Sequence, residues 1–405
     1  MEKLENTPSL RFPEFNGEWN KMKLGEICEI VGGGTPDTNI PKYWGGVIQW
    51  FTPTEIKSDF VSNSIRTITE LGLQKSSAKK LPIGTILLTT RATIGEVSIA
   101  QEECSTNQGF QSLIARKGNS NIFIFNWIKQ NKHELTSRAN GSTFPEISKT
   151  AIEKIFLNAP SLPEQQKIAS FLSSVDEKIQ QLCRKKELLV LYKKGVMKQL
   201  FSGKLRFKDE NGEDYADWEE KKLGDVAKFR RGSFPQPYGL PKWYDDENGM
   251  PFIQVYDVDH NMVLKKTTKN KISKLGAEQS VFVKKGTLVI TIQGSIGRIA
   301  KTQYDAYVDR TLLIFQSYKL PTDLDYFKYV VFLLFEIEKT KAPGGTIKTI
   351  TKEVLTDFIV PIPCLKEQQK IATFLSSIDA KIESTSQQIN QTQSFKKGLL
   401  QQMFV

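Results

Sequence analysis

Two stretches of the chain repeat an apolar residue at alternating steps of four and three positions. Eight of ten such positions are apolar from Ile168 onward, and seven of ten from Ile371 onward. This 3.5-residue period, held over about five heptads, predicts two long helices that pair as a coiled coil. The predicted seam residues are Ile168, Leu172, Val175, Ile179, Leu182, Leu189, Ile371, Leu375, Ile378, Ile382, Ile389 and Leu399.

The ends of the first helix carry recognisable signals. Ser161-Leu162-Pro163-Glu164 fits a capping box with proline in the first turn, and Gly203 is a plausible stop. The second helix has Cys364 where the first has its capping serine, so its start is less firmly marked. A helix over 164–201 would be roughly 57 Å long, at about 1.5 Å per residue.

The two stretches are copies of each other. Residues 162–179 and 365–382 share fourteen of eighteen residues at an offset of 203, and the same offset holds to the ends of both helices. Upstream, the offset drifts to 202 at Gly286 and 199 at Lys222, and identities are few. The order is therefore globule, helix, globule, helix. It predicts a cyclic, pseudo-two-fold molecule in which two helices of equal length pack antiparallel and space the globules.

The globular halves mix short β-like runs, such as 84–90 and 286–292, with helical stretches near 122–135 and 325–339. We therefore expect an α/β (α+β) domain in each half. The predicted boundaries are 1–160 for the first domain, 161–204 for its helix, 205–363 for the second domain, and 364–405 for its helix.

Composition narrows the setting. The net charge is +11, of which +5 lies on residues 161–204 and +2 on 364–405. A basic balance suits a polyanion such as nucleic acid. The basic run on the first helix consists of Arg184, Lys185, Lys186, Lys193, Lys194 and Lys198. It is either a solvated face or a contact with DNA or an acidic partner. Four scattered cysteines, a polar N-terminus and no long apolar run lead us to expect a reducing cytoplasm, with no disulfide framework, zinc site or membrane span.

Several polar clusters have the chemistry to contact DNA. Arginine pairs with guanine, and glutamine or asparagine with adenine, through two hydrogen bonds in the major groove. The loops at 91–95, 140–143, 293–297 and 343–346 carry small and hydroxyl residues that let the backbone approach phosphates. The candidate residues are Gln49, Thr52, Lys57, Arg91, Thr93, Asn107, Gln108, Ser142, Thr143, Arg230, Arg231, Gln254, Tyr256, Gln293, Ser295, Arg310 and Thr346.

Signals for catalysis are weak. The chain has no phosphate-binding loop of the Gly-x-x-x-x-Gly-Lys type and no Asn-Pro-Pro-Tyr-like loop of an adenine methyltransferase, and it has only two histidines, His133 and His260. Pro36-Asp37 with Glu55-Ile56-Lys57 loosely fits a magnesium-dependent nuclease pattern, but Asp37 lies in a turn-like segment. We expect no catalytic residue, metal or cofactor in this chain.

Four motifs together resemble the specificity subunit of type I restriction-modification systems. They are Pro-x-Leu-x-Glu-Gln-Gln-Lys-Ile-Ala at both helix starts, the Gly-x-Thr turns at 141 and 344, the segment 87–95, and Tyr43-Trp44-Gly45-Gly46-Val47-Ile48-Gln49-Trp50. The resemblance spans nearly the whole chain. It implies two target-recognition domains that each bind half of a split, asymmetric site in double-stranded DNA.

The resemblance also implies partners. The helices would set the gap between the half-sites and dock two modification subunits, which use S-adenosylmethionine, and restriction subunits that use ATP and Mg²⁺ would join the complex. Two other hypotheses stay open: a scaffold without direct base reading, and a nuclease acting alone.

Overall fold

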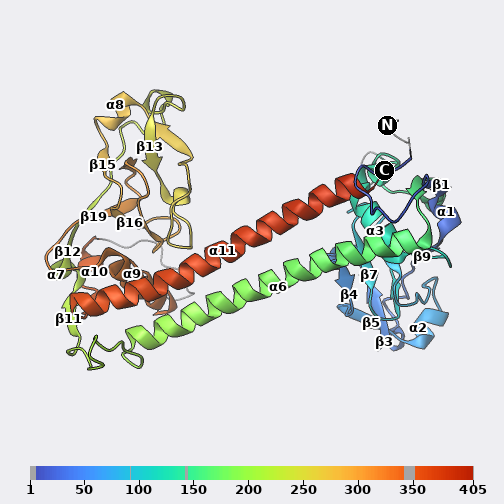
Figure 1. Ribbon diagram of the computed structural model, residues 1–405, viewed down its shortest axis with the longest axis horizontal. Helices are drawn as coiled ribbons and strands as arrows, with labels where there is room; N and C mark the ends of the chain where they lie inside the picture. Colours follow the sequence, from blue (N-terminus) through green and yellow to red (C-terminus); the bar gives the residue numbers. More distant parts are fainter. Residues whose placement is uncertain (1–5, 92, 142–144, 342–351, 405) are drawn as a thin grey trace. The chain divides into compact units, whose positions relative to one another are not determined.

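The computed structural model describes residues 6–91, 93–141, 145–341 and 352–404. They form two compact units (Figure 1). The first unit contains the chain up to Arg184 together with the residues from Thr385 onward, and the second contains Lys185–Ser384. Each unit therefore holds one globular domain, the start of the helix that follows it, and the end of the other long helix.

In the first unit, a five-stranded sheet of order β2-β9-β6-β7-β4 lies beside a three-stranded sheet, β5-β3-β8, and a two-stranded sheet, β1-β10. Most pairs are antiparallel, but β3 pairs with β8 in parallel, and β4 with β7. The strands are β1 Asn20–Lys23, β2 Cys28–Gly32, β3 Trp44–Phe51, β4 Phe60–Val61, β5 Arg66–Ile68, β6 Ile86–Leu88, β7 Val97–Ala100, β8 Cys104–Thr106, β9 Gln111–Ala115 and β10 Phe156–Ala159. The helices are α1 Leu24–Ile27, η1 Pro41–Tyr43, η2 Pro53–Glu55, α2 Glu70–Gln74, α3 Asn121–Gln130, α4 Lys132–Thr136 and α5 Lys149–Glu153.

The second unit repeats this plan with two four-stranded sheets, of order β12-β19-β16-β17 and β14-β13-β18-β15, and a two-stranded sheet, β11-β20. Its strands are β11 Glu219–Lys222, β12 Ala227–Arg231, β13 Met250–Ile253, β14 Asn270–Ile272, β15 Val281–Val283, β16 Leu288–Thr291, β17 Ile299–Lys301, β18 Ala306–Val308, β19 Leu312–Tyr318 and β20 Ile359–Ile362. Its helices are α7 Leu223–Val226, η3 Pro241–Trp243, η4 Val255–Asp257, α8 Lys274–Ala277, α9 Leu324–Lys341 and α10 Lys352–Thr356.

The two long helices, α6 (Leu162–Phe201) and α11 (Leu365–Met403), contribute to the cores of both units. In the first unit, Leu172 of α6 and Met403 of α11 belong to one apolar core. In the second, Leu200 of α6 lies in the same core as Leu375 of α11. The start of each helix thus lies with the end of the other, which is the order of an antiparallel pair. The predicted fold, two mixed α/β domains with two long antiparallel helices, is confirmed.

Burial follows the four-and-three period. Nine of the twelve predicted seam residues are buried, and Ile179, Leu189 and Ile382 are half-buried. Burying one leucine or isoleucine side chain contributes about 1.5–3 kcal/mol, so the seam is a large part of what holds each helix end in its unit. Gly203 has a φ of +71° just after α6, a conformation that glycine adopts without strain.

Among the described residues, no helix is long and apolar enough to span a bilayer. All four cysteines are free thiols; Cys28 and Cys104 are buried, Cys183 is half-buried and Cys364 is exposed.

Candidate nucleic-acid interface

The short loop between β8 and β9, residues 107–109, is where several segments that carry candidate residues of the first domain meet. We call it the first hub loop. Segments from three distant parts of the chain bond to it or to its flank. These bonds run from Gly34 N to Thr106 O (2.8 Å), from Asn107 N to Phe51 O (3.1 Å) and from Thr90 N to Gly109 O (2.8 Å). Loops that are far apart in sequence are therefore fixed around one point.

The second domain builds the same arrangement around residues 309–311, between β18 and β19, which we call the second hub loop. The corresponding bonds run from Ser233 N to Val308 O (3.0 Å), from Asp309 N to Ile253 O (3.0 Å) and from Ile292 N to Thr311 O (2.9 Å). Every partner lies 199 or 202 residues after its counterpart in the first domain. The backbone frame is therefore duplicated, although the sequences have diverged.

A capping carboxylate supports each frame. Glu55 accepts hydrogen bonds from the Thr52 and Ile65 amides, both at 2.7 Å. Asp257 does the same for the Gln254 and Lys269 amides, at 2.8 and 2.9 Å, and burial raises the pKa of this carboxyl group. The Glu55 carboxylate is therefore engaged with backbone amides of this frame, whereas the nuclease pattern would need it to bind Mg²⁺.

The described residues hold no cluster of three or more His, Cys, Asp or Glu side chains that could bind a metal ion. Asp37 is exposed, and its carboxylate caps the Asn39 amide at 2.9 Å. His133 and His260 are both exposed, each beside a neighbouring carboxylate, Glu134 and Asp259 respectively.

Although the frame is shared, the side chains on it differ between the domains. The matched positions are Thr35 and Phe234, Thr52 and Gln254, Thr54 and Tyr256, Arg91 and Gln293, and Gln108 and Arg310. One scaffold thus presents two chemically different sets of groups.

In the first domain, Gln108 is exposed and its Oε1 accepts a hydrogen bond of 2.5 Å from the Thr35 hydroxyl. Asn107 is a turn former, because its Oδ1 accepts from the Gly109 amide at 2.9 Å. The exposed Arg91 pairs with Glu146 at 2.8 Å. These loops therefore present one oriented amide and one paired guanidinium.

The other candidates of the first domain either bond to neighbouring residues of the fold or are exposed side chains outside the first hub loop. The carbonyl oxygen of the half-buried Gln49 side chain accepts from both the amide (2.7 Å) and the hydroxyl (2.9 Å) of Ser64. Lys57 and Thr93 are exposed. The amides of Thr93 and Gly95 are bonded inside the turn, so contact with phosphate there would depend on side chains.

In the second domain, the guanidinium of the exposed Arg310 lies 5.0 Å from the centroid of the Tyr238 ring. Tyr238 is itself 52% exposed and packs on Phe234. The Arg231 side chain donates to the Arg310 carbonyl oxygen, and Arg230 is exposed beside it. Arg231, Arg310 and the Tyr238 ring are thus gathered at the second hub loop, with Arg230 next to them in sequence.

Gln254 and Tyr256 form a network with Asn270. The Asn270 amide donates to Gln254 Oε1 and to the Tyr256 hydroxyl oxygen, both at 2.8 Å, and the Tyr256 hydroxyl donates to Gln254. Gln254 is buried, and burial, reinforced by the charge of Asp257, raises the pKa of Tyr256 to about 12. Gln293 is half-buried and Ser295 exposed, while Ser142, Thr143 and Thr346 lie outside the described residues.

Sequence reasoning missed Thr35, Thr54 and Tyr238. Thr35 was hidden in a glycine-rich segment that resembles an ordinary turn, and Tyr238 follows a proline-rich loop. For Thr54 the offset was an available signal, because counting 202 residues on from it leads to the candidate Tyr256.

The repeated helix starts are explained by a duplicated buried contact. In the first unit, Glu164 is buried and accepts from the guanidinium of Arg11 (2.7 and 2.8 Å) and the indole of Trp19 (3.2 Å). In the second, Glu367 binds Arg206 (3.2 and 2.9 Å) and Trp218 (2.9 Å) in the same way. The recurring Leu-Arg-Phe segments therefore belong to the helix anchor.

The next residue of the motif fastens the helix to its own domain. The Gln165 side chain accepts from the Ser120 amide at the start of α3 and donates to the Pro160 carbonyl oxygen, both at 2.9 Å. Gln368 accepts from the Asp323 amide at the start of α9 (2.8 Å) and donates to the Pro363 carbonyl oxygen (2.9 Å).

A second duplicated contact joins the helix ends. Lys193 Nζ lies 2.5 Å from Asp379 Oδ1 in the second unit, and Lys396 Nζ lies 2.5 Å from Asp176 Oδ1 in the first. Both lysines occupy seam positions and are buried. The expectation that Lys193 belongs to an outward basic face is therefore wrong. Burial lowers its pKa, and the hydrogen bond to Asp379 opposes that shift.

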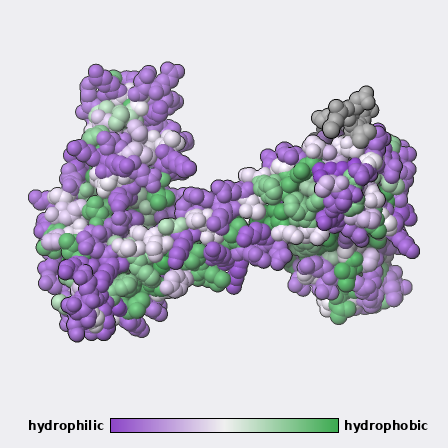
Figure 2. All heavy atoms as spheres, viewed as in Figure 1, coloured by the Kyte–Doolittle hydropathy of each residue, from purple (hydrophilic) through white to green (hydrophobic). Residues whose placement is uncertain are grey.

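Of the other members of the basic run, Lys186 is half-buried, whereas Arg184, Lys185, Lys194 and Lys198 are exposed. Apolar side chains lie exposed on α6 as well: Leu188 (50%), Leu191 (61%) and Tyr192 (53%). Figure 2 shows hydrophobic atoms at the surface in places along the course of α6. The matching position of Tyr192 in α11 is Phe395, which is also 56% exposed.

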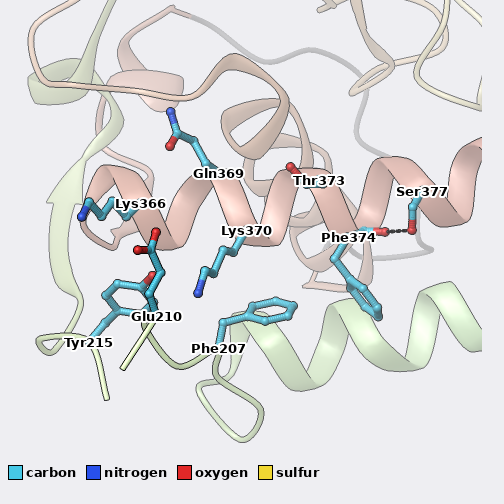
Figure 3. A pocket seen from close by; sticks show the side chains of 9 residues that line it. All are labelled: Phe207, Glu210, Tyr215, Lys366, Gln369, Lys370, Thr373, Phe374 and Ser377. Carbon is cyan, nitrogen blue, oxygen red and sulfur yellow. Dashed lines mark hydrogen bonds between the residues drawn. The ribbon is translucent and has the colours of Figure 1, made fainter. Parts of the chain in front are cut away.

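A shallow hollow of about 620 Å³ lies at the start of α11 (Figure 3). Its walls come from the helix and from the segment 207–215, and Lys370 bridges them by donating to the Lys208 carbonyl oxygen at 2.6 Å. Gln369 and Ser377 on its helical wall are identical to Gln166 and Ser174 of α6.

The amino-acid sequence is similar to a known family of proteins in both halves of the chain. The model of the type I restriction modification DNA specificity domain matches residues 16–189 and again residues 215–393. The MjaIX specificity subunit of Methanocaldococcus jannaschii is 29% identical over 408 residues, covering 95% of this chain and 92% of the relative. The MjaVIII specificity subunit of the same organism is 24% identical over 417 residues, covering 98% and 94%.

Solved structures share the fold. The S subunit of the type I restriction-modification system from M. genitalium has a TM-score of 0.60 at 16% identity, covering 98% of this chain and 99% of that one. A chain from a structure described in terms of complex assembly and conformational transition of the type I R-M system has a TM-score of 0.62 at 18% identity, covering 96% and 97%.

Proposed function

The chain belongs to the family of type I restriction-modification DNA specificity subunits, and we propose that each of its two target-recognition domains reads one half of a bipartite, asymmetric DNA site. A specificity subunit recognises DNA and leaves catalysis to other subunits of the complex. The half-site assignment rests on one observation: the same backbone frame carries different side chains in the two domains. If both domains read the same bases, no such divergence would be needed at the matched positions around the hub loops.

The proposal extends to the helices, which would set the gap between the half-sites and dock two modification subunits. Five pairs of exposed residues are identical in the two long helices: Gln166 and Gln369, Ser174 and Ser377, Lys178 and Lys381, Lys194 and Lys397, and Gln199 and Gln402. Two equal surfaces suit two equal partners. The partners would supply S-adenosylmethionine binding, and the associated restriction subunits would use ATP and Mg²⁺.

A second pair of features supports docking. Gly195 and Gly398 lie inside the long helices, and apart from the adjoining residues and backbone of the same helix no heavy atom lies within 4 Å of the position that a Cβ would take at either. Glycine inside a helix costs about 1 kcal/mol relative to alanine. A close approach by a partner backbone would explain why both copies keep it.

The test is to map the methylated motif in DNA from cells that contain the modification subunit with this chain, without it, or with residues 1–160 replaced by those of another specificity subunit. We expect a bipartite motif that depends on this chain and changes in one half only after the replacement. An unchanged motif would favour a scaffold without base reading, and no motif at all would overturn the proposal.

A further inference from the structure

Gln108 and Arg310 occupy the same position of the two hub loops. Each follows a residue whose side-chain oxygen holds the turn: Asn107 Oδ1 accepts from the Gly109 amide, and Asp309 Oδ1 from the Thr311 amide, both at 2.9 Å. Both side chains are exposed, and they lie at the point where the surrounding loops converge. The fold therefore holds their backbone still and leaves their side chains to the solvent.

Each of the two side chains also rests on a partner from a corresponding loop, which follows β2 in the first domain and β12 in the second. The Thr35 hydroxyl donates to Gln108 Oε1, which leaves the Nε2 group and one lone pair of Oε1 for a ligand. The Arg310 guanidinium lies over the Tyr238 ring. Supporting contacts of this kind reduce the entropy lost when a side chain binds.

The two functional groups have different complements among the bases. A glutamine amide donates to N7 and accepts from N6 of adenine, whereas an arginine guanidinium donates to both O6 and N7 of guanine. We infer that Gln108 specifies an adenine in the half-site of the first domain and that Arg310 specifies a guanine in that of the second. The inference rests on the proposed function and goes further, because it names one residue and one base for each half.

A contact with the DNA backbone is the competing role, above all for the arginine. A phosphate contact carries no sequence information, so its loss weakens binding to every sequence alike. A base contact instead changes the preference at one position and leaves the others as they were. The two roles are therefore separated by measuring preference as well as overall activity.

The experiment measures methylation by the complete complex of duplexes that differ only at the assigned base pair. Gln108→Ala should lower the preference for adenine in the first half-site by roughly 10- to 100-fold, and Arg310→Ala the preference for guanine in the second, each leaving the other half unchanged. Gln108→Arg should move the first preference from adenine toward guanine. The untouched half of the same molecule is an internal control for folding.

Matched variants test the supporting contacts. Thr35→Val should weaken the adenine preference, and Tyr238→Ala the guanine preference, whereas Tyr238→Phe should keep it because the ring remains. Lys117→Ala, at an exposed position in the turn after β9 that is not among the candidate DNA contacts, should change neither. If the wild-type complex reads a bipartite motif but the Gln108 and Arg310 variants lose activity equally on all bases, this inference is overturned and the proposed function stands. If the wild-type complex shows no bipartite preference, the proposed function itself fails.

Discussion

Replacing the two open helix glycines with alanine should make the free chain more stable and its complex weaker. Both residues have helical backbones and lack the positive φ that would favour glycine. Because a Cβ at either position would meet no heavy atom within 4 Å apart from the adjoining residues and backbone of the same helix, the substitution adds no clash. Alanine is favoured over glycine inside a helix by about 0.8–1 kcal/mol, partly through the lower entropy of the unfolded chain.

Gly195 belongs to the second unit and Gly398 to the first, so each variant should stabilise its own unit by roughly 1 kcal/mol. For a unit of about 200 residues this corresponds to a rise in Tm of roughly 2–4 °C. If a partner helix packs closely over these positions, the added methyl group should cost roughly 1–3 kcal/mol of overpacking, which is roughly a 5- to 150-fold loss of affinity.

The assay combines thermal denaturation of the free chain with titration of the modification subunit. Ser384→Ala is a matched control, because this exposed α11 position also gains helix propensity but corresponds to Gln181 in the other copy and is not part of a repeated surface. A gain in stability with unchanged affinity would refute the docking argument. A loss of stability would show that the space around the glycines is not open.

Two further predictions concern buried groups. Lys193→Met should destabilise the second unit by about 2 kcal/mol, because the partly buried Asp379 carboxylate loses its cationic partner and keeps, among the described residues, the Tyr329 hydroxyl at 2.6 Å. In denaturant titrations the double variant with Asp379→Asn should cost less than the two single changes added together, and simple additivity would speak against direct pairing. For the cysteines, burial raises the pKa of Cys28 and Cys104 to about 12, so almost no thiolate is present at pH 8. An alkylating reagent should therefore label exposed Cys364 first, and equal labelling of Cys28 in the native protein, measured by mass spectrometry, would contradict the fold.

The long helices were predictable because a 3.5-residue period records burial directly. Polar residues at seam positions were harder to interpret. Lys193 and Lys396 interrupt the apolar series, and only the structure shows that each pairs with an aspartate of the other helix. The repetition of both the lysine and the Leu-Ser-Ser-x-Asp segment was the available signal, since two copies of a polar residue at one seam position suggest a pairing partner.

The grouping of loops around the two hub loops could not be predicted from the sequence, because these loops come together only through strand pairing. The parallel pairing of β3 with β8 brings the segment at Thr52 to the first hub loop, across more than fifty residues of sequence. Candidate lists based on residue type therefore mixed exposed groups such as Gln108 with the buried Gln254, whose amide is engaged by Tyr256 and Asn270. Residue chemistry indicates which groups could contact DNA, and the tertiary frame decides which of those side chains are free to do so.

The exposed lysines of α6 fall into two groups when each is compared with its counterpart in α11. A docking surface for two identical partners should be the same in both helices, as Lys194 and Lys397 are. Lys185 and Lys198 correspond instead to Gln388 and Gln401, so this part of the basic surface occurs once. A feature that occurs once suits something that the complex contains once and that is itself asymmetric. We therefore favour the DNA between the two half-sites as the partner of these lysines over a second docking surface, because a polyanion attracts exposed cations at any point along its length.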